Sequence, residues 1–547
     1  MKIYLLVLIA LCIVLAVAGL AFPGNLDSRD QALQGLYVLD VFYNGNYILP
    51  YAHGTEPASK PPLYNWIAAL VSIPFGEVNE VSIKIPAILS AIGLVLVTFF
   101  FARKLLGDKA GFISALILIA NFHFIKLETV ARTDMMLTFF ITLSLFLFYK
   151  GYVATDGKVR GRYYFYFYVV CALGTLTKGL VALALPALAI FIYLWVVSDL
   201  RHIKEMRIFT GAVVYSVLVL AWFIPALLIG GKEFWNKVVV NEMWERFWGI
   251  GSRSEATRPF YYLWGHLLGK FLPWSIFLPF AIWRVFPIKR SAAAQPLLFP
   301  FIWFATFFIF FTISAGKRAD YIFLLYPAGA IVVAYLLDIE MDVRRKVIER
   351  VFIVTFIVLP FAFLGLVIFY SIPLILAKTN YFGNRALSLE IGIIIDIILL
   401  VIVLLTSRII KKRKIIVIIP LLLVTIVLNI GWIIFGINSS SNLDYNGDIT
   451  RKFCKKVENT VGNKPIYFFG VHNSILFYLK RNVRQLSEAE VKELAIKGGD
   501  YVVSEARAIG RIFDYKDVGT TVIHELTLTS YGSSVNALIL LQFHPQK

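Results

Sequence analysis

Two carboxylates and several basic side chains border the long apolar runs of this sequence. Asp30 and Asp134 lie beside such runs, in Ser-Arg-Asp-Gln and Ala-Arg-Thr-Asp. The basic residues in comparable positions are Lys60, Lys178, Lys317 and Arg318. Ionisable groups at membrane depth are costly, so charged residues within or beside apolar spans are candidates for function. We expect these side chains to converge on one polar cavity.

Such a set of side chains suits the transfer of a group away from a phosphate. One carboxylate can accept the proton of an attacking hydroxyl, while Lys or Arg neutralises the charge that develops on the departing phosphate. Because the second pKa of a phosphomonoester is about 6, this phosphate leaves without a strong general acid. The predicted site therefore needs one base and several cations.

Each candidate also has a purely structural explanation. Asp30 can cap the helix that follows it, and Asp134 can cap its own helix or pair with Arg132. Lys60 precedes two prolines and can anchor the chain at a membrane interface. The structural alternative for Lys178, Lys317 and Arg318 is that they end helices and extend their charged groups toward water.

Membrane-spanning helices must position these residues. The 547-residue chain is 59% hydrophobic and 16% charged, with mean hydropathy +0.76, which is too apolar for a soluble globular protein. Its 53 basic and 34 acidic residues give a net charge of +19. The basic residues form short clusters between apolar runs, so topology signals and anionic lipids explain them better than nucleic acid does. The sequence predicts a mainly α-helical polytopic membrane protein.

The apolar runs predict 13 spans when two shorter runs are accepted. They lie near residues 3–22, 82–105, 111–125, 134–152, 163–176, 179–198, 208–229, 268–286, 296–314, 321–338, 351–373, 390–408 and 415–436. We interpret the first as a retained helix rather than a cleaved signal peptide, because it is long enough to cross a bilayer.

Basic residues mark alternate loops between these spans. The loops in question contain Arg103, Arg160, Arg207, Arg290, Arg345 and Arg413. The positive-inside rule makes these loops and the N-terminus cytoplasmic, which places the tail outside. The outer loops then include 23–81 and 230–267. Within the first of them, the stretches 28–43 and 62–75 predict short helices on the membrane surface.

The tail differs from the transmembrane domain, which we place at 1–437. In residues 438–547, apolar runs of strand length alternate with polar, helix-like stretches. The predicted strands are 466–471, 501–504, 520–528 and 537–543, and the predicted helices are 473–481 and 487–497. The tail is therefore expected to form a small α/β domain on the periplasmic side. Its sequence has no phosphate-binding glycine loop, nucleophile elbow or metal-ligand spacing.

At these residues the chain resembles the polyprenyl-phosphate-dependent glycosyltransferases of the GT-C class. The resemblance is to the aminoarabinose (lipid A) transferase and protein O-mannosyltransferase-like group. The matching signatures include Ser28-Arg29-Asp30-Gln31, Lys60-Pro61-Pro62-Leu63-Tyr64-Asn65-Trp66, Arg132-Thr133-Asp134, Thr177-Lys178-Gly179 and Gly316-Lys317-Arg318-Ala319-Asp320-Tyr321-Ile322. The signatures keep their order and cover most of residues 20–335.

The resemblance implies a bacterial inner-membrane enzyme that acts on the periplasmic face. It implies inverting transfer from undecaprenyl phosphate of 4-amino-4-deoxy-L-arabinose, or a similar pentose or hexose, to a lipid A or glycan acceptor. Asp30 would be the principal catalytic carboxylate, Asp134 the second acidic residue, and Lys60 a ligand of the donor phosphate. The other residues that would line the phosphate site are Lys178, Lys317 and Arg318. We expect a monomer with no nucleic-acid partner.

The sequence departs from the family pattern at three places. Gln31 and Ser59 stand where glutamates are usual, and Thr257 aligns with a histidine that can bind a divalent metal. We therefore expect neither a metal ion at that place nor another cofactor, although His53 and Glu56 keep a nearby metal site open. The acceptor is also open between lipid A and other glycans.

Three rival functions remain. A protein hydroxyl can replace the glycan as acceptor, which would make the chain a protein O-glycosyltransferase. A transporter or flippase of lipid-linked sugars also needs many helices and charges. Transporters tend to show internal repeats and charges near the midplane, whereas only Asp396 lies deep in a predicted span. An inactive structural relative would not need Asp30, Asp134 and Lys60.

Overall fold

The structure is a computed structural model, and the part of it described here consists of two compact units. The first unit contains the described residues within 1–21, 59–64 and 86–339, and the second contains 26, 29–58, 65–85 and the described residues from 447 onward. The described residues are 1–21, 26, 29–251, 257–285, 296–339, 447–462, 464–471, 473–480, 485–498, 500–512, 520–528 and 536–543. The last three predicted spans, Asp396 and the predicted domain boundary at 437 lie outside them.

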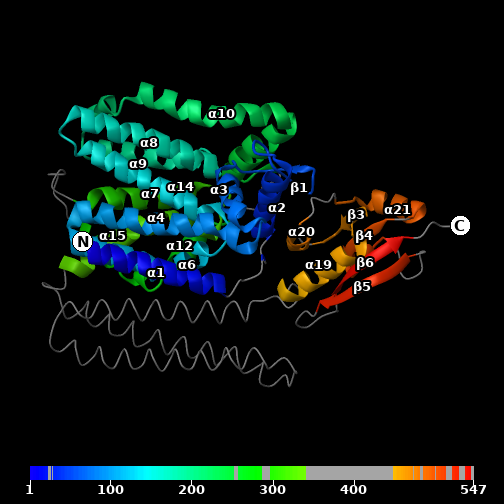
Figure 1. Cartoon of the computed structure of the whole chain (residues 1–547). Helices are drawn as coiled ribbons and strands as arrows, with labels where there is room; N and C mark the ends of the chain where they lie inside the picture. Colours follow the sequence, from blue (N-terminus) through cyan, green and yellow to red (C-terminus); the bar gives the residue numbers. More distant parts are fainter. Residues whose placement is uncertain are drawn as a thin grey trace, which may run out of the picture. The chain divides into compact units, whose positions relative to one another are not determined.

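Apolar helices build the first unit, and the longer ones run side by side (Figure 1). They are α1 (Lys2–Ala21), α4 (Glu80–Leu106), α5 (Asp108–Ile119), α6 (Phe122–Glu128), α7 (Thr133–Tyr152), α8 (Gly157–Lys178), α9 (Val181–Val196), α10 (Ile208–Trp235), α14 (Leu298–Ile313) and α15 (Tyr326–Ile339). Short elements between them are η2 (Leu200–Met206), η3 (Asn236–Glu245), α11 (Arg246–Trp248), α12 (Tyr262–Lys270), η5 (Trp274–Ile276), α13 (Leu278–Val285) and η7 (Ala319–Leu325).

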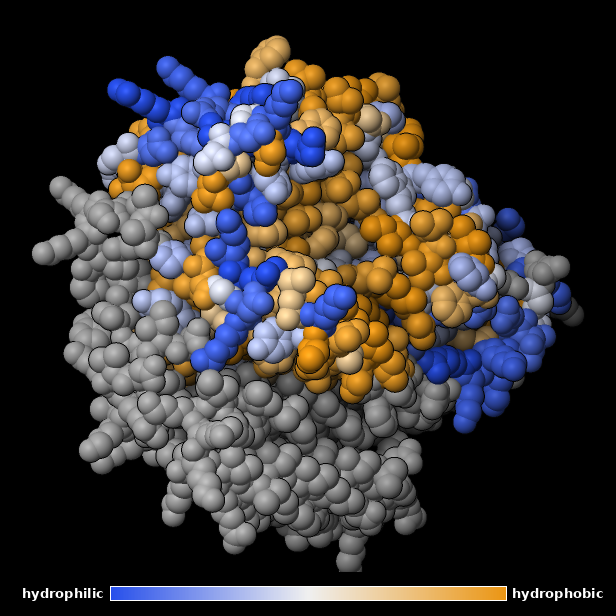
Figure 2. Space-filling view, turned by 60° about the vertical axis from the view of Figure 1, so that its left-hand side comes forward, coloured by the Kyte–Doolittle hydropathy of each residue, from blue (hydrophilic) through white to orange (hydrophobic). Residues whose placement is uncertain are grey.

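Several of these helices have the length and composition of membrane spans. Among the described residues, Glu80–Leu106, Thr133–Tyr152, Ile208–Glu245 and Ala319–Leu337 qualify, and α5 with α6 qualifies as a bent pair. Large apolar side chains remain exposed on the outside of the bundle, including Phe209 at 84% and Leu228 at 80%. Figure 2 shows broad hydrophobic surface interrupted by hydrophilic patches. Such a surface suits helices surrounded by lipid.

Three predicted spans are interrupted in the structure. The predicted helix 111–125 is bent by 70° between α5 and α6. Asn121 starts α6 there, since its side chain accepts a hydrogen bond from the Phe124 N–H. The predicted helix 268–286 is divided into α12, η5 and α13, and 321–338 begins as η7 before α15. Sequence hydropathy located these segments but missed their breaks.

The second unit includes the predicted surface helices and the tail. The helices are α2 (Arg29–Asn44), α3 (Leu63–Ser72) and η1 (Ile73–Phe75), of which α3 begins in the first unit. A short hairpin is formed by β1 (Tyr51–Ala52) and β2 (Glu56–Pro57). The tail contains α19 (Gly447–Val461), β3 (Ile466–Phe469), α20 (Asn473–Tyr478), α21 (Glu488–Lys497), β4 (Tyr501–Glu505), α22 (Ala506–Ile509), β5 (Thr520–Leu528) and β6 (Asn536–Phe543). Its sheet order is β3-β4-β6-β5, with only the β3–β4 pair parallel. The predicted α/β tail is confirmed, and α19 is an addition to it.

Close contacts join α2 to α20 within this second unit. A Cβ atom on Gly35 would lie 2.6 Å from the Phe477 ring, so the two helices touch where glycine leaves space. Nearby, Arg451 Nη2 lies 2.7 Å from Glu80 Oε1, and the Tyr478 hydroxyl donates to the same carboxylate. The tail is therefore packed against the helix that carries Asp30.

Candidate active site

Asp134 is held by cations at one end of the helices of the first unit. It lies in the first turn of α7, and its side chain is only 3% exposed. Lys178 Nζ donates to Asp134 Oδ1 over 2.5 Å, and Arg132 Nε lies 3.2 Å from Oδ2. The positive charge of Lys60 also acts on this carboxylate. The structure thus brings together three predicted site residues, Asp134, Lys178 and Lys60.

The end of α8 places Lys178. Lys178 is the last residue of this helix, and Gly179 follows with φ +88°. Glycine adopts this left-handed conformation at little cost, so the chain can turn sharply into α9. The Lys178 ammonium also lies 5.8 Å from the centre of the Tyr321 ring. Lys178 is therefore anchored in the cluster and does not extend into solvent as a free helix end.

Asp320 is a second carboxylate of this cluster. It lies in the first turn of η7 and its side chain is 19% exposed. Arg132 Nη1 donates to Oδ2 over 2.7 Å, Lys270 Nζ donates to Oδ1 over 2.8 Å, and His123 Nε2 lies 3.0 Å from Oδ1. Burial lowers the pKa of the Arg132 guanidinium, but Asp134 and Asp320 raise it by more. Arg132 is thus a protonated bridge between two aspartates.

The bend between α5 and α6 brings part of this cluster together. Asn121 caps α6 and also donates from Nδ2 to the backbone oxygen of Lys270 over 3.0 Å. His123 follows in the first turn of α6, and its Nδ1 lies 3.2 Å from the Tyr326 hydroxyl. The two ring nitrogens of His123 therefore have fixed partners, which sets the orientation of the imidazole.

Lys317 and Arg318 lie in the loop that leads into η7. Lys317 is only 6% exposed, and its Nζ donates to the backbone oxygens of Ser314 over 2.5 Å and Arg258 over 3.2 Å. Burial lowers the pKa of this ammonium. Lys317 therefore ties two loops together, which is a structural role beside the predicted one. The charge of Arg318 acts on Arg132, so Arg318 is near the cluster.

Asp30 belongs to the second unit. Helix α2 begins at Arg29, so Asp30 lies inside its first turn rather than at the cap position. A carboxylate there is favoured by the positive end of the helix dipole. Farther along α2, Asp40 accepts hydrogen bonds from Asn44, Asn46 and the Tyr51 N–H, which shapes the loop after the helix. The catalytic role of Asp30 stays a prediction.

Several basic side chains of the described residues gather around the two carboxylates of the first unit. Arg132, Lys178 and Lys270 pair with Asp134 and Asp320, and the charge of Lys60 also acts on Asp134. Fixed cations in a partly buried site stabilise an anion such as a phosphate. The arrangement can therefore hold a phosphate while its carboxylates keep the cations in place.

No metal centre is visible in the described part of the chain. Within those residues there is no group of three or more His, Cys, Asp or Glu side chains that could hold a metal ion. Thr257 forms a β-bridge with Gly316, and its hydroxyl donates to the backbone oxygen of Gly249 over 3.3 Å. Metal independence stays a prediction.

Sequence reasoning missed Asp320, His123 and Lys270 as site residues. Asp320 and His123 lie in apolar segments, so the rule that selected Asp134 applies to them as well. Their importance follows from pairing across the chain, since His123 and Asp320 are 197 positions apart. The sequence did not mark Lys270 as a candidate. It ends a short helix at a position that was predicted to be the edge of a membrane span.

Comparisons with known proteins show which proteins this chain is similar to. The sequence model of the dolichyl-phosphate-mannose-protein mannosyltransferase family matches residues 59–229. An uncharacterised protein of Aquifex aeolicus is 29% identical over 332 residues, which are 60% of this chain and 63% of that protein. The undecaprenyl phosphate-alpha-4-amino-4-deoxy-L-arabinose arabinosyl transferase of Pseudomonas aeruginosa is 28% identical over 284 residues, 51% of this chain and 49% of that protein. The matched part thus spans 49–63% of the length of these two relatives.

A solved structure extends the likeness to the whole fold. The crystal structure of ArnT from Cupriavidus metallidurans bound to undecaprenyl phosphate aligns with a TM-score of 0.77 at 18% identity. The alignment covers 99% of this chain and 99% of that one. The predicted fold class and the predicted resemblance are confirmed: the chain is a polytopic membrane protein of GT-C fold that resembles the polyprenyl-phosphate-dependent glycosyltransferases.

Proposed function

We propose that this protein is an inner-membrane glycosyltransferase that moves a sugar from undecaprenyl phosphate to a lipid A or glycan acceptor on the periplasmic face. The observation that carries the proposal is the cationic cluster around Asp134 and Asp320. This cluster is partly buried, groups the basic side chains of Arg132, Lys178 and Lys270 around its two carboxylates, and lies at one end of the spans in a GT-C fold. The likeness to aminoarabinose transferases supports the donor class.

The proposed reaction breaks one bond and forms one. The acceptor hydroxyl attacks the anomeric carbon of the sugar, and the bond from that carbon to the phosphate oxygen breaks. Asp30 takes the hydroxyl proton, and the polyprenyl phosphate leaves with the bonding electrons. Attack opposite the leaving group inverts the anomeric centre.

The remaining predicted residues act on the departing phosphate. Lys60 and Lys178 supply positive charge to the developing dianion, while Asp134 holds both Lys178 and Arg132 in place. Arg318 adds charge from the loop before η7. Lys317 contributes a further cation only if it exchanges one of its backbone partners for phosphate.

A protein hydroxyl is the second candidate acceptor. The match of residues 59–229 to the dolichyl-phosphate-mannose-protein mannosyltransferase family supports it. The chemistry at the anomeric carbon is the same for both acceptors. Mass spectrometry of lipid A, surface glycans and glycoproteins from a deletion strain would show which product disappears.

The catalytic assignment is tested with Asp30→Asn in the purified full-length protein. We expect transfer from a labelled polyprenyl-phosphate sugar to fall at least about 100-fold, with expression and thermal stability retained. Asp108→Asn removes one carboxylate from an exposed position and serves as the matched control. Full activity of Asp30→Asn would disprove the assignment. If the parent moves lipid-linked sugar across vesicles without changing its linkage, the protein is a transporter.

A further inference from the structure

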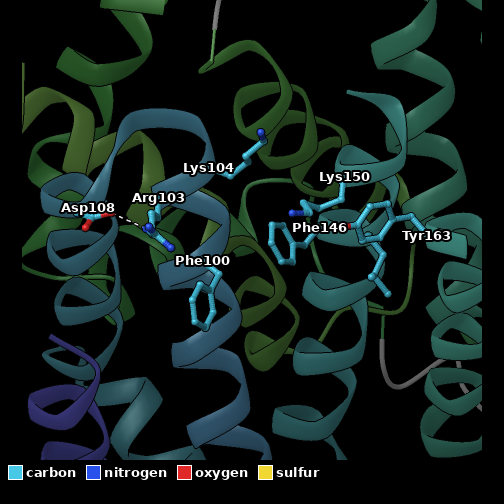
Figure 3. Close-up of a pocket in the computed structure, with 8 residues that line it drawn as sticks. Phe100, Arg103, Lys104, Asp108, Phe146, Lys150 and Tyr163 are labelled. Carbon is cyan, nitrogen blue, oxygen red and sulfur yellow. Dashed lines mark hydrogen bonds and ion pairs between the residues drawn. The ribbon is translucent and has the colours of Figure 1, made fainter. Parts of the chain in front are cut away.

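A second charged site lies at the opposite end of α7. A pocket of about 540 Å³ opens between the last turns of α4 and α7 and the first turns of α8 (Figure 3). Its charged lining residues are Arg103, Lys104, Asp108 and Lys150. Asp134 and Lys150 are 16 residues apart in α7, which corresponds to about 24 Å along the helix axis. This pocket is therefore separate from the candidate active site.

The pocket has positive charge that the described residues do not neutralise. Arg103 is paired with Asp108, and both side chains are partly exposed, at 38% and 46%. Neither Lys104 nor Lys150 has a carboxylate partner within the described part of the chain. Lys150 lies 5.3 Å from the centre of the Tyr163 ring, a contact that leaves its ammonium able to bind an anion. Figure 3 shows Lys104 and Lys150 extending from facing helices.

Apolar side chains form the rest of the pocket. Phe100, Phe146 and Leu147 line it, and all three are half-buried. They belong to α4 and α7, both of which have the length and composition of membrane spans. Behind them, Phe101 packs against Phe146 with ring centres 5.2 Å apart, which holds the two helices together at this level. The pocket thus joins a cationic rim to an apolar wall at the end of the spans.

We propose that this pocket binds an anionic glycerophospholipid. The phosphodiester of the lipid lies between Lys104 and Lys150, and an acyl chain lies along Phe100, Phe146 and Leu147. Basic pockets between transmembrane helices bind anionic lipid head groups in this way, and the volume is in the range of small-ligand sites. A free phosphate would gain nothing from the apolar wall. The inference is independent of the proposed glycosyl transfer.

Lipid binding is measured on the full-length protein in detergent by native mass spectrometry and thermal shift. The probes are phosphatidylglycerol, phosphatidylcholine with the same acyl chains, and inorganic phosphate. We expect phosphatidylglycerol to bind about tenfold more tightly than phosphatidylcholine and to raise the Tm, while inorganic phosphate does neither. Equal binding of the two lipids, or an equal Tm shift with inorganic phosphate, would overturn the proposal.

Variants of the two pocket lysines test whether the lipid binds in the pocket. The double variant Lys104→Gln/Lys150→Gln should lose the preference for phosphatidylglycerol, and Lys104→Arg/Lys150→Arg should keep most of it. The matched control is Lys158→Gln/Arg162→Gln, which removes two exposed charges from the start of α8 outside the pocket lining. The control should bind as the parent does. An unchanged preference in the Lys104→Gln/Lys150→Gln protein, with its Tm equal to that of the parent, would show that the lipid binds elsewhere.

Discussion

The two ends of α7 differ in how their charged side chains are buried and paired. At the end near Asp134, two carboxylates that are 3% and 19% exposed are surrounded by Arg132, Lys178 and Lys270. At the other end, the pair Arg103–Asp108 is exposed and two further lysines have no carboxylate partner among the described residues. The charged groups at the first end form a fixed network. At the second end, the lysine ammonium groups can bind an anionic ligand.

Burial explains why the two ends should respond differently to change. Removing one partner of a buried ion pair leaves an uncompensated charge in a medium that solvates it poorly, so the cost is large. An exposed pair is screened by water and salt, so its loss costs little. Fixed cations that cannot relax also stabilise a developing negative charge most effectively.

The largest effect is expected for Asp320→Asn. The substitution removes the charge that holds Arg132, Lys270 and His123, and should lower the free energy of unfolding by about 3–5 kcal/mol. Thermal unfolding in detergent measures this change, and sugar transfer should be lost with it. The matched control Asp108→Asn, at the other end of the helices, should change stability by less than about 1 kcal/mol. Equal effects of the two variants would contradict the distinction between the two ends.

A smaller effect is expected from the coupling of Asp134 with Lys178. The variants Asp134→Asn and Lys178→Met and their combination form a double-mutant cycle. Because the two groups touch in a buried site, their coupling energy should be about 1–3 kcal/mol. The same cycle with Arg103→Met and Asp108→Asn should give less than about 0.5 kcal/mol. Chemical or thermal unfolding of the purified proteins gives both values, and a larger coupling at the exposed pair would refute the comparison.

Lys317→Met tests whether Lys317 is structural or contacts the donor. Loss of two hydrogen bonds to backbone oxygens should lower stability by about 1–3 kcal/mol, because a buried carbonyl is left unpaired. If its main role is structural, the KM for the sugar donor should rise much less than it does for Lys60→Met. Transfer kinetics over a range of donor concentrations provide the comparison. An equal rise in KM with unchanged stability would assign Lys317 to phosphate binding instead.

Much of the fold could be predicted because hydropathy is a local property. Apolar runs located α1, α4, α7 and α14, and shorter apolar runs of strand length located the strands of the tail. The breaks were harder to predict, since Asn121 starts α6 without interrupting the apolar run. Helix α19 was not predicted, because its residues are polar except on the one face that is buried.

The candidate site could be predicted only in part. Asp134, Lys178 and Lys60 were found because each borders an apolar run, and the structure does bring them together. The connection from Arg132 to Asp320 spans 188 positions, and no local pattern shows that these two side chains meet. Long-range pairing is set by how the helices pack, so it became visible only in three dimensions.

The smallest expected effect is a difference between the two ends of α7 in their sensitivity to salt concentration. Raising the salt concentration from 0.15 M to 1 M shortens the screening length from about 8 Å to about 3 Å. Binding of phosphatidylglycerol at Lys104 and Lys150 should weaken several-fold, because these charges lie at the surface. The stability difference between the parent and Asp320→Asn should change less, because the Asp320 side chain is only 19% exposed. Native mass spectrometry and thermal unfolding at both salt concentrations measure the two quantities, and a salt-sensitive Asp320 would mean that the network is open to solvent.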